Sequence, residues 1–145
     1  MIKLPQNKKG FLWLLIFFSF AGFLSATYLS IEHYLGRTPS CSFLGGCDIV
    51  AKSKYAQVGP IPVALLGVGY FLGLLFLFLA FLDSKKEVFL KLAFGLSVVG
   101  FFVALVFLWL QFFVIGAVCL YCLISDISAV IIFFLLLPNK KIYGN

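Results

Sequence analysis

The feature that most constrains this chain is a stretch of 34 residues, from Leu92 to Ser125, that contains no charged side chain. As one helix it would be about 50 Å long, whereas the hydrocarbon core of a bilayer is about 30 Å thick. The chain must therefore turn back on itself within this stretch. Gly116, in the segment FVIGAV, is the expected turn because glycine tolerates the backbone conformations that turns require.

The other apolar runs complete a set of four predicted membrane spans. Residues 11–31 and 61–82 carry no charge, and each run is long enough to cross a bilayer. The first run is too long and too aromatic for a signal peptide, so it is expected to be a retained anchor. The break at the glycine divides the third region into spans at residues 88–114 and 119–137.

Composition excludes a water-soluble domain. Of the residues, 63% are hydrophobic and only 11% are charged, so too little polar surface is available to cover a soluble globule. The sequence therefore predicts an all-α integral membrane protein. We expect a single domain over residues 1–145, built as a bundle of four transmembrane helices.

The positive charges orient this bundle and do not indicate a nucleic-acid surface. The net charge is +6, but Lys and Arg occur in short clusters between the apolar runs, and cytoplasmic loops carry an excess of them. Eight of the eleven lie at one set of span ends: Lys3, Lys8, Lys9, Lys85, Lys86, Lys91, Lys140 and Lys141. The other three lie on the opposite side: Arg37, Lys52 and Lys54. Both termini are therefore expected in the cytoplasm, in a multi-pass protein of the cell membrane.

This orientation brings all four cysteines to the extracytoplasmic face. Cys41 and Cys47 lie in the loop after the first span, and Cys119 and Cys122 form a C-x-x-C pair at the start of the fourth. Disulfides persist outside the cytoplasm, and C-x-x-C is the spacing of dithiol redox sites. The start of a helix also favours a thiolate, which is the reactive form. The pattern indicates a thiol–disulfide oxidoreductase.

Three other interpretations of the cysteines stay open. They could form structural disulfides that tie the outer loop to the bundle, in a membrane scaffold without enzymatic activity. They could bind zinc, but zinc pairs are usually separated by about two to four residues, and one pair here is separated by five. They could also be free thiols packed as small hydrophobic side chains. We expect no metal site.

The combination of motifs resembles the vitamin K epoxide reductase family, in its prokaryotic type. The motifs are the outer-loop pair in CSFLGGCDIV, the serine in SKYAQVGPIPVALLG, and the C-x-x-C that opens the last span. The resemblance extends from the first span to the fourth. It implies a four-helix bundle around a quinone of the ubiquinone, menaquinone or vitamin K type. We expect no fused thioredoxin-like domain after the last span, so the resemblance also implies a separate thioredoxin-like or DsbA-like partner.

The same resemblance implies roles for individual residues. Cys41 would exchange with the partner protein, and Cys47 would then form a transient disulfide with Cys119. Cys122, one turn deeper, would face the quinone and reduce it. Ser53 corresponds to a serine near the active site that stabilises the reactive state by hydrogen bonding.

Asp126 is the position at which the chain departs from the animal members, which carry a tyrosine there that is associated with vitamin K and warfarin contact. It lies one helical turn after Cys122 on the same face, so it could supply protons to the quinone. Alternatively it is a neutral, hydrogen-bonded acid whose partner is Ser125, Ser128 or a polar group on another span. Gln111 is expected either to contact the quinone or to reach the membrane interface.

The expected function is a membrane thiol:quinone oxidoreductase that oxidises a thioredoxin-like partner and supports disulfide bond formation. The alternative enzyme is a vitamin K epoxide or quinone reductase that uses thiols as the electron donor. Both enzymes would use the same four cysteines, so substrate tests are needed to distinguish between them.

Overall fold

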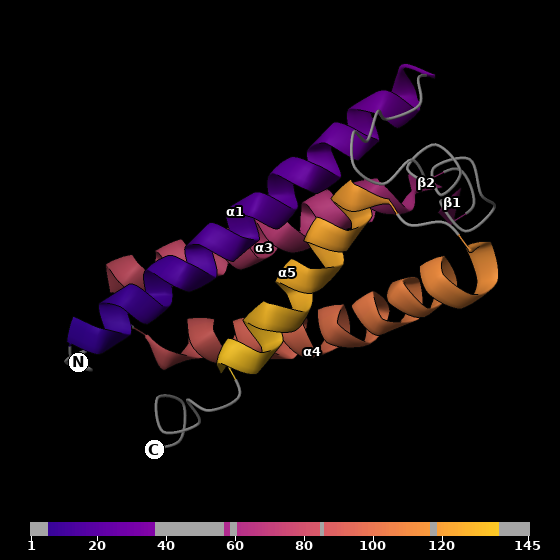
Figure 1. The fold of residues 1–145 in the computed structure, drawn as a ribbon. Coiled ribbons are helices and arrows are strands. Elements are labelled where there is room, and N and C mark those ends of the chain that lie inside the picture. Colours follow the sequence, from indigo (N-terminus) through magenta and orange to yellow (C-terminus); the bar gives the residue numbers. More distant parts are fainter. Residues whose placement is uncertain (1–5, 37–56, 59–60, 85, 117–118, 137–145) are drawn as a thin grey trace.

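The structure, a computed structural model, describes residues 6–36, 57–58, 61–84, 86–116 and 119–136. Its elements are almost all helices (Figure 1). In chain order they are α1 (Gln6–Tyr34), β1 (Gln57–Val58), β2 (Ile61–Pro62), α3 (Val63–Ser84), α4 (Glu87–Trp109), the π-helix η2 (Leu110–Ile115) and α5 (Leu120–Leu136).

Length and composition fit a membrane protein. Among the described residues, three helical segments are long and apolar enough to cross a bilayer: residues 10–34, Val63–Ser84 and Val88–Ile115. The helix α5 is also apolar but has 17 residues, which corresponds to about 26 Å. The prediction of a helical membrane protein is therefore confirmed.

The helix α1 extends beyond the predicted first span, residues 11–31, at both ends, and the elements differ in kind from the predicted spans at two places. Ile61 and Pro62, which the sequence analysis placed in the second span, instead form β2, with Val58 paired opposite Ile61. The helix begins directly after the proline, at Val63. At the other place, α4 ends at Trp109 and the last turns before the break widen into η2.

The predicted turn at Gly116 is confirmed. This glycine caps η2 with a φ of 71°, in the left-handed region that favours glycine. Leu120 begins α5 only four positions later, so the chain reverses within a short connection. The 34-residue uncharged stretch is thus divided between two helices, as its length requires.

The four long helices form a closed ring of contacts. The helix α1 packs against α3 and α5, and α4 packs against the same two helices from the other side. The start of α1 and the end of α5 lie at one end of the bundle, and the β1–β2 hairpin lies at the other (Figure 1).

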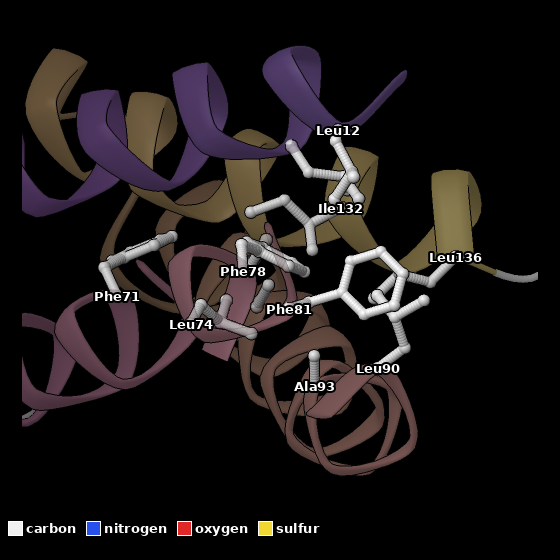
Figure 2. Close-up of a cluster of buried hydrophobic side chains, with 12 residues drawn as sticks. Leu12, Phe71, Leu74, Phe78, Phe81, Leu90, Ala93, Ile132 and Leu136 are labelled. Atoms are coloured by element: carbon white, nitrogen blue, oxygen red, sulfur yellow. The ribbon is translucent and has the colours of Figure 1, made fainter. Parts of the chain in front are cut away.

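One half of the bundle is filled by a hydrophobic core (Figure 2). Its residues come from the beginning of α1, the later turns of α3, the earlier turns of α4 and the end of α5. They include Leu12, Leu15, Leu74, Phe78, Phe81, Leu90, Ala93, Ile132 and Leu136. Their packing fixes the four helices relative to one another at this end and leaves the opposite half for the site.

Candidate functional site

A cavity of about 720 Å³ lies in the half of the bundle opposite the packed core. Its walls come from the end of α1, the beginning of α3, the last turns of α4 with η2, and the beginning of α5. Phe71, Ala104 and Ala129 belong to both the core and the cavity wall, so they mark the boundary between the two halves.

The cavity wall is mainly apolar, with a small set of polar and sulfur-containing side chains. These are His33, Tyr70, Gln111, Cys122, Ser125 and Asp126. Four of the six come from η2 or the first turns of α5, so the polar groups gather near the C-x-x-C pair. Apolar walls with a few placed polar groups are typical of sites for small apolar ligands.

The two cysteines of the C-x-x-C pair occupy different positions. Cys119 is fully buried and lies immediately before α5, and its carbonyl accepts a hydrogen bond from the Leu123 N–H at 2.9 Å. Cys122 lies in the first turn of α5, is half-buried and lines the cavity. Both carry free thiols. The pair therefore connects the buried start of the helix with the cavity.

The surroundings of Cys119 favour its thiolate. The hydrogen bond from the Cys122 side chain lowers the pKa of Cys119 to about 7, against the opposing effect of burial. Backbone hydrogen bonds from Cys122 and Tyr121 also lower the pKa of Cys119. A thiolate at a helix start, surrounded by N–H donors, is the expected nucleophile of a dithiol site.

Gln111 links the C-x-x-C motif to Asp126. Its amide oxygen Oε1 accepts the backbone N–H of Cys119 at 3.0 Å, and its Nε2 donates to Oδ2 of Asp126 at 3.1 Å. Because a backbone N–H can only donate, this contact fixes which end of the amide faces the acid. The side chain is 2% exposed, so one buried residue of η2 holds two positions of the next helix.

Packing from α1 supports the same motif. The rings of Tyr28 and Tyr121 lie 4.6 Å apart between centroids, and Leu29 packs against the buried Cys119. Ile115, the last residue of η2, packs there as well. The C-x-x-C pair is thus held from both neighbouring elements.

The structure places the predicted site residues as follows. Cys119, Cys122 and Asp126 lie together at the beginning of α5, and the latter two line the cavity. Cys41, Cys47 and Ser53 lie outside the described residues.

Two polar contacts distinguish between the alternatives drawn from the sequence. The hydrogen-bond partner of Asp126 is Gln111, a polar side chain of the preceding span, and not Ser125 or Ser128. Gln111 itself is buried and does not reach the membrane interface. Sequence reasoning also missed Tyr70 in the cavity wall, because nothing in its uncharged segment distinguishes it from other aromatic residues.

Comparison with known protein families gives a match. The profile of the Vitamin K epoxide reductase family matches residues 13–137, which is most of the chain. No curated protein sequence matches the chain. The matched segment begins in α1 and extends past the end of α5, so it includes every helix that lines the cavity. With the match extending over the whole helical bundle, the chain belongs to the vitamin K epoxide reductase family.

Proposed function

We propose that this protein is a membrane thiol:quinone oxidoreductase that oxidises a thioredoxin-like partner and thereby supports disulfide bond formation. The observation that carries the proposal is the position of Cys122. Its thiol lines an apolar cavity of about 720 Å³, while its C-x-x-C partner Cys119 lies at the helix start directly outside. A flat, apolar, membrane-soluble quinone of the ubiquinone, menaquinone or vitamin K type suits such a cavity.

The proposed relay transfers two electrons at each step. The partner dithiol reduces the Cys41–Cys47 disulfide through a mixed disulfide with Cys41. Cys47 then attacks a Cys119–Cys122 disulfide at Cys119, so that the loop pair is oxidised again and the membrane pair is reduced.

In the last step of the relay, electrons and protons pass from the two thiols to the quinone in equal numbers. The thiols of Cys119 and Cys122 become a disulfide, and the quinone becomes a hydroquinone. The two electrons come from the sulfurs, and the two protons that the hydroquinone needs equal the two that the thiols lose. Since Cys119 is largely ionised above about pH 7, one of these protons must be held elsewhere in the site.

Asp126 is the proposed holder of that proton. It lines the cavity one turn after Cys122, and Gln111 donates to its Oδ2, which leaves Oδ1 to carry the proton. Ser53 is proposed, from the family resemblance, to stabilise the reactive state by hydrogen bonding.

The proposed topology has four spans with both termini in the cytoplasm and the cysteines outside. The helix α5 is the fourth span, and with its flanking residues it can cross the bilayer core. Lys86 and Lys91 are exposed at the start of α4, next to the packed core and away from the C-x-x-C pair. Lysine at this end and cysteine at the other fit the preference of Lys and Arg for the cytoplasmic side.

The test is anaerobic reduction of menadione, a soluble quinone, by the purified protein with dithiothreitol as the donor. Wild type should reduce the quinone and Cys122→Ser should not, because the variant cannot form the Cys119–Cys122 disulfide. Thermal unfolding of both proteins controls for loss of the fold.

Three outcomes separate the alternatives. Quinone turnover that depends on Cys122 supports the proposal. Additional turnover of vitamin K epoxide would favour the epoxide reductase. A folded wild type that reduces neither substrate, with disulfides that resist the dithiol, would favour a structural scaffold.

A further inference from the structure

The hydroxyl of Tyr70 is a buried polar group without a hydrogen-bond partner among the described residues. Tyr70 lies on α3 and lines the cavity, whereas Cys122 lines the same cavity from α5. A buried hydroxyl that makes no hydrogen bond destabilises the folded protein, so it needs a physical explanation. Since Tyr70 is a lining residue of the apolar cavity, a ligand in that cavity is the candidate for the missing acceptor.

The unpaired serine hydroxyls do not indicate a ligand in the way that the Tyr70 hydroxyl does. Ser19 and Ser125 also have buried hydroxyls without partners among the described residues, but Ser19 lines no part of the cavity. A serine in a helix can rotate to donate to a carbonyl of the preceding turn, as Ser30 does to Ala26 at 2.9 Å. The phenol oxygen of Tyr70 is too far from its own backbone to do so.

The position of the Tyr70 hydroxyl is fixed by its neighbours. A Cβ atom placed at Gly100 of α4 would overlap the hydroxyl and the adjoining ring carbons, so the glycine leaves the space that the phenol occupies. The Tyr70 ring also makes an edge-to-face contact with Phe71, with 4.9 Å between centroids. The phenol is therefore packed between Gly100 of α4 and the ring of Phe71.

We infer that the hydroxyl of Tyr70 donates a hydrogen bond to a carbonyl oxygen of the quinone bound in the cavity. The inference rests on the proposed function and adds a binding residue to it. A quinone is the fitting occupant because its ring is apolar, as the wall is, and its polar atoms are hydrogen-bond acceptors. Tyrosine as a donor on α3 and the reducing thiol on α5 would then fix the ligand from two helices.

The first test is Tyr70→Phe, which removes one oxygen and keeps the ring. Without quinone, the variant should be at least as heat-stable as wild type, because only an unsatisfied hydroxyl is lost. Menadione should raise the unfolding temperature of wild type more than that of the variant. The KM for menadione should rise about three- to tenfold, the range expected for one neutral hydrogen bond.

The second test displaces the hydroxyl without removing it. Gly100→Ala should weaken the menadione-dependent stabilisation, because the added methyl group occupies the position of the Tyr70 hydroxyl. Gly95→Ala on the same helix is the matched control, since a Cβ there meets nothing within 4 Å. Both changes replace glycine by alanine within α4, so their effects on helix propensity cancel in the comparison.

The outcomes separate this inference from the proposed function. If wild type binds and reduces menadione and Tyr70→Phe does so with the same KM and the same thermal shift, the role of Tyr70 is wrong and the proposed function stands. If wild type neither binds nor reduces menadione, the role of Tyr70 and the proposed function are both wrong. Equal menadione stabilisation of Gly100→Ala and Gly95→Ala would refute the placement of the hydroxyl.

Discussion

At the scale of the residue, Cys119 shows how local donors can outweigh burial. A buried thiol normally keeps its proton, because an apolar environment disfavours the charged form. Here the Cys122 side chain and the backbone N–H groups of residues 121 and 122 donate to the sulfur and lower the pKa of Cys119 to about 7. The free thiol should therefore be mostly ionised above that pH.

Titration of the thiolate absorbance tests this value in a variant with Cys41→Ser and Cys47→Ser. In the folded protein we expect ultraviolet absorbance of the Cys119 thiolate to rise with pH around a midpoint near 7. Adding Cys122→Ala should move the midpoint upward, because the largest stabilising hydrogen bond is lost. The same protein unfolded in denaturant provides the reference. A folded-state midpoint equal to the unfolded one would contradict the assignment.

Some residues of the site could be predicted from the sequence, and others could not. Cys119, Cys122 and Asp126 follow from spacing alone, because positions three or four apart share one face of a helix. Tyr70 and Gln111 could not be placed in this way. The helix of Tyr70 and the helix that leads into η2 are apolar on every side, so no polar face indicates which positions point inward.

At the scale of the element, η2 explains why the sequence left open whether Gln111 faces the site or the membrane interface. A π-helix has more residues per turn than an α-helix, so the positions in η2 face directions that regular helical spacing does not give. Gln111 is buried there, while the next residue, Phe112, is 56% exposed. Isolated π-helical turns are frequent at functional sites, and this one positions the donor and acceptor that hold the start of α5.

Replacing Gln111 by leucine should loosen the start of α5. The Cys119 N–H would lose its acceptor in a buried position, which should cost about 1–3 kcal/mol of stability. Amide hydrogen exchange at the first turn of α5 should become faster than in wild type, and menadione turnover should fall because Asp126 loses its donor.

Phe112→Leu is the control for this change, because it alters an exposed neighbour within the same π-helix. It should keep the exchange pattern and the turnover of wild type. Unchanged exchange at α5 in Gln111→Leu would show that the two hydrogen bonds of the glutamine do not hold the helix.

The short β1–β2 pair shows another limit at this scale. Strands of two residues are too short to have a recognisable period, so the apolar segment that contains Ile61 and Pro62 predicts a span where the structure has β2. Length, in contrast, was decisive for the region after Lys91. A segment too long for one crossing had to turn, and glycine was the residue that permitted it.

At the scale of the whole molecule, the bundle divides stability and binding between its two halves. The core half contains fully buried side chains such as Phe78, Phe81 and Ile132, and the other half encloses the cavity. The helices run through both halves, so the packed half can hold the cavity open when no ligand fills it. A substitution in the core half should therefore change stability and leave ligand binding intact, and a substitution in the cavity half should do the reverse.

Two substitutions on α3 test this division. Phe78→Ala should cost about 3–5 kcal/mol of stability, because it empties a fully buried site. The menadione-induced rise in unfolding temperature should persist, because Phe78 does not line the cavity. Gly69→Leu should have the opposite effects. Gly69 lines the cavity, and a Cβ there meets nothing within 4 Å, so the larger side chain can enter the ligand space without disturbing the fold.

In Gly69→Leu the unfolding temperature without quinone should stay the same or rise, because leucine favours the helix more than glycine does. The response to menadione should be lost. If Gly69→Leu retained the menadione response, the ligand would not occupy the cavity beside α3. If Phe78→Ala abolished the response while the protein remained folded, the core would determine the shape of the site and the two halves would not be independent. Thermal unfolding with and without menadione distinguishes these results in one experiment. Phe78→Ala should lower the unfolding temperature without menadione and keep the menadione-induced rise, whereas Gly69→Leu should keep or raise that temperature and lose the rise.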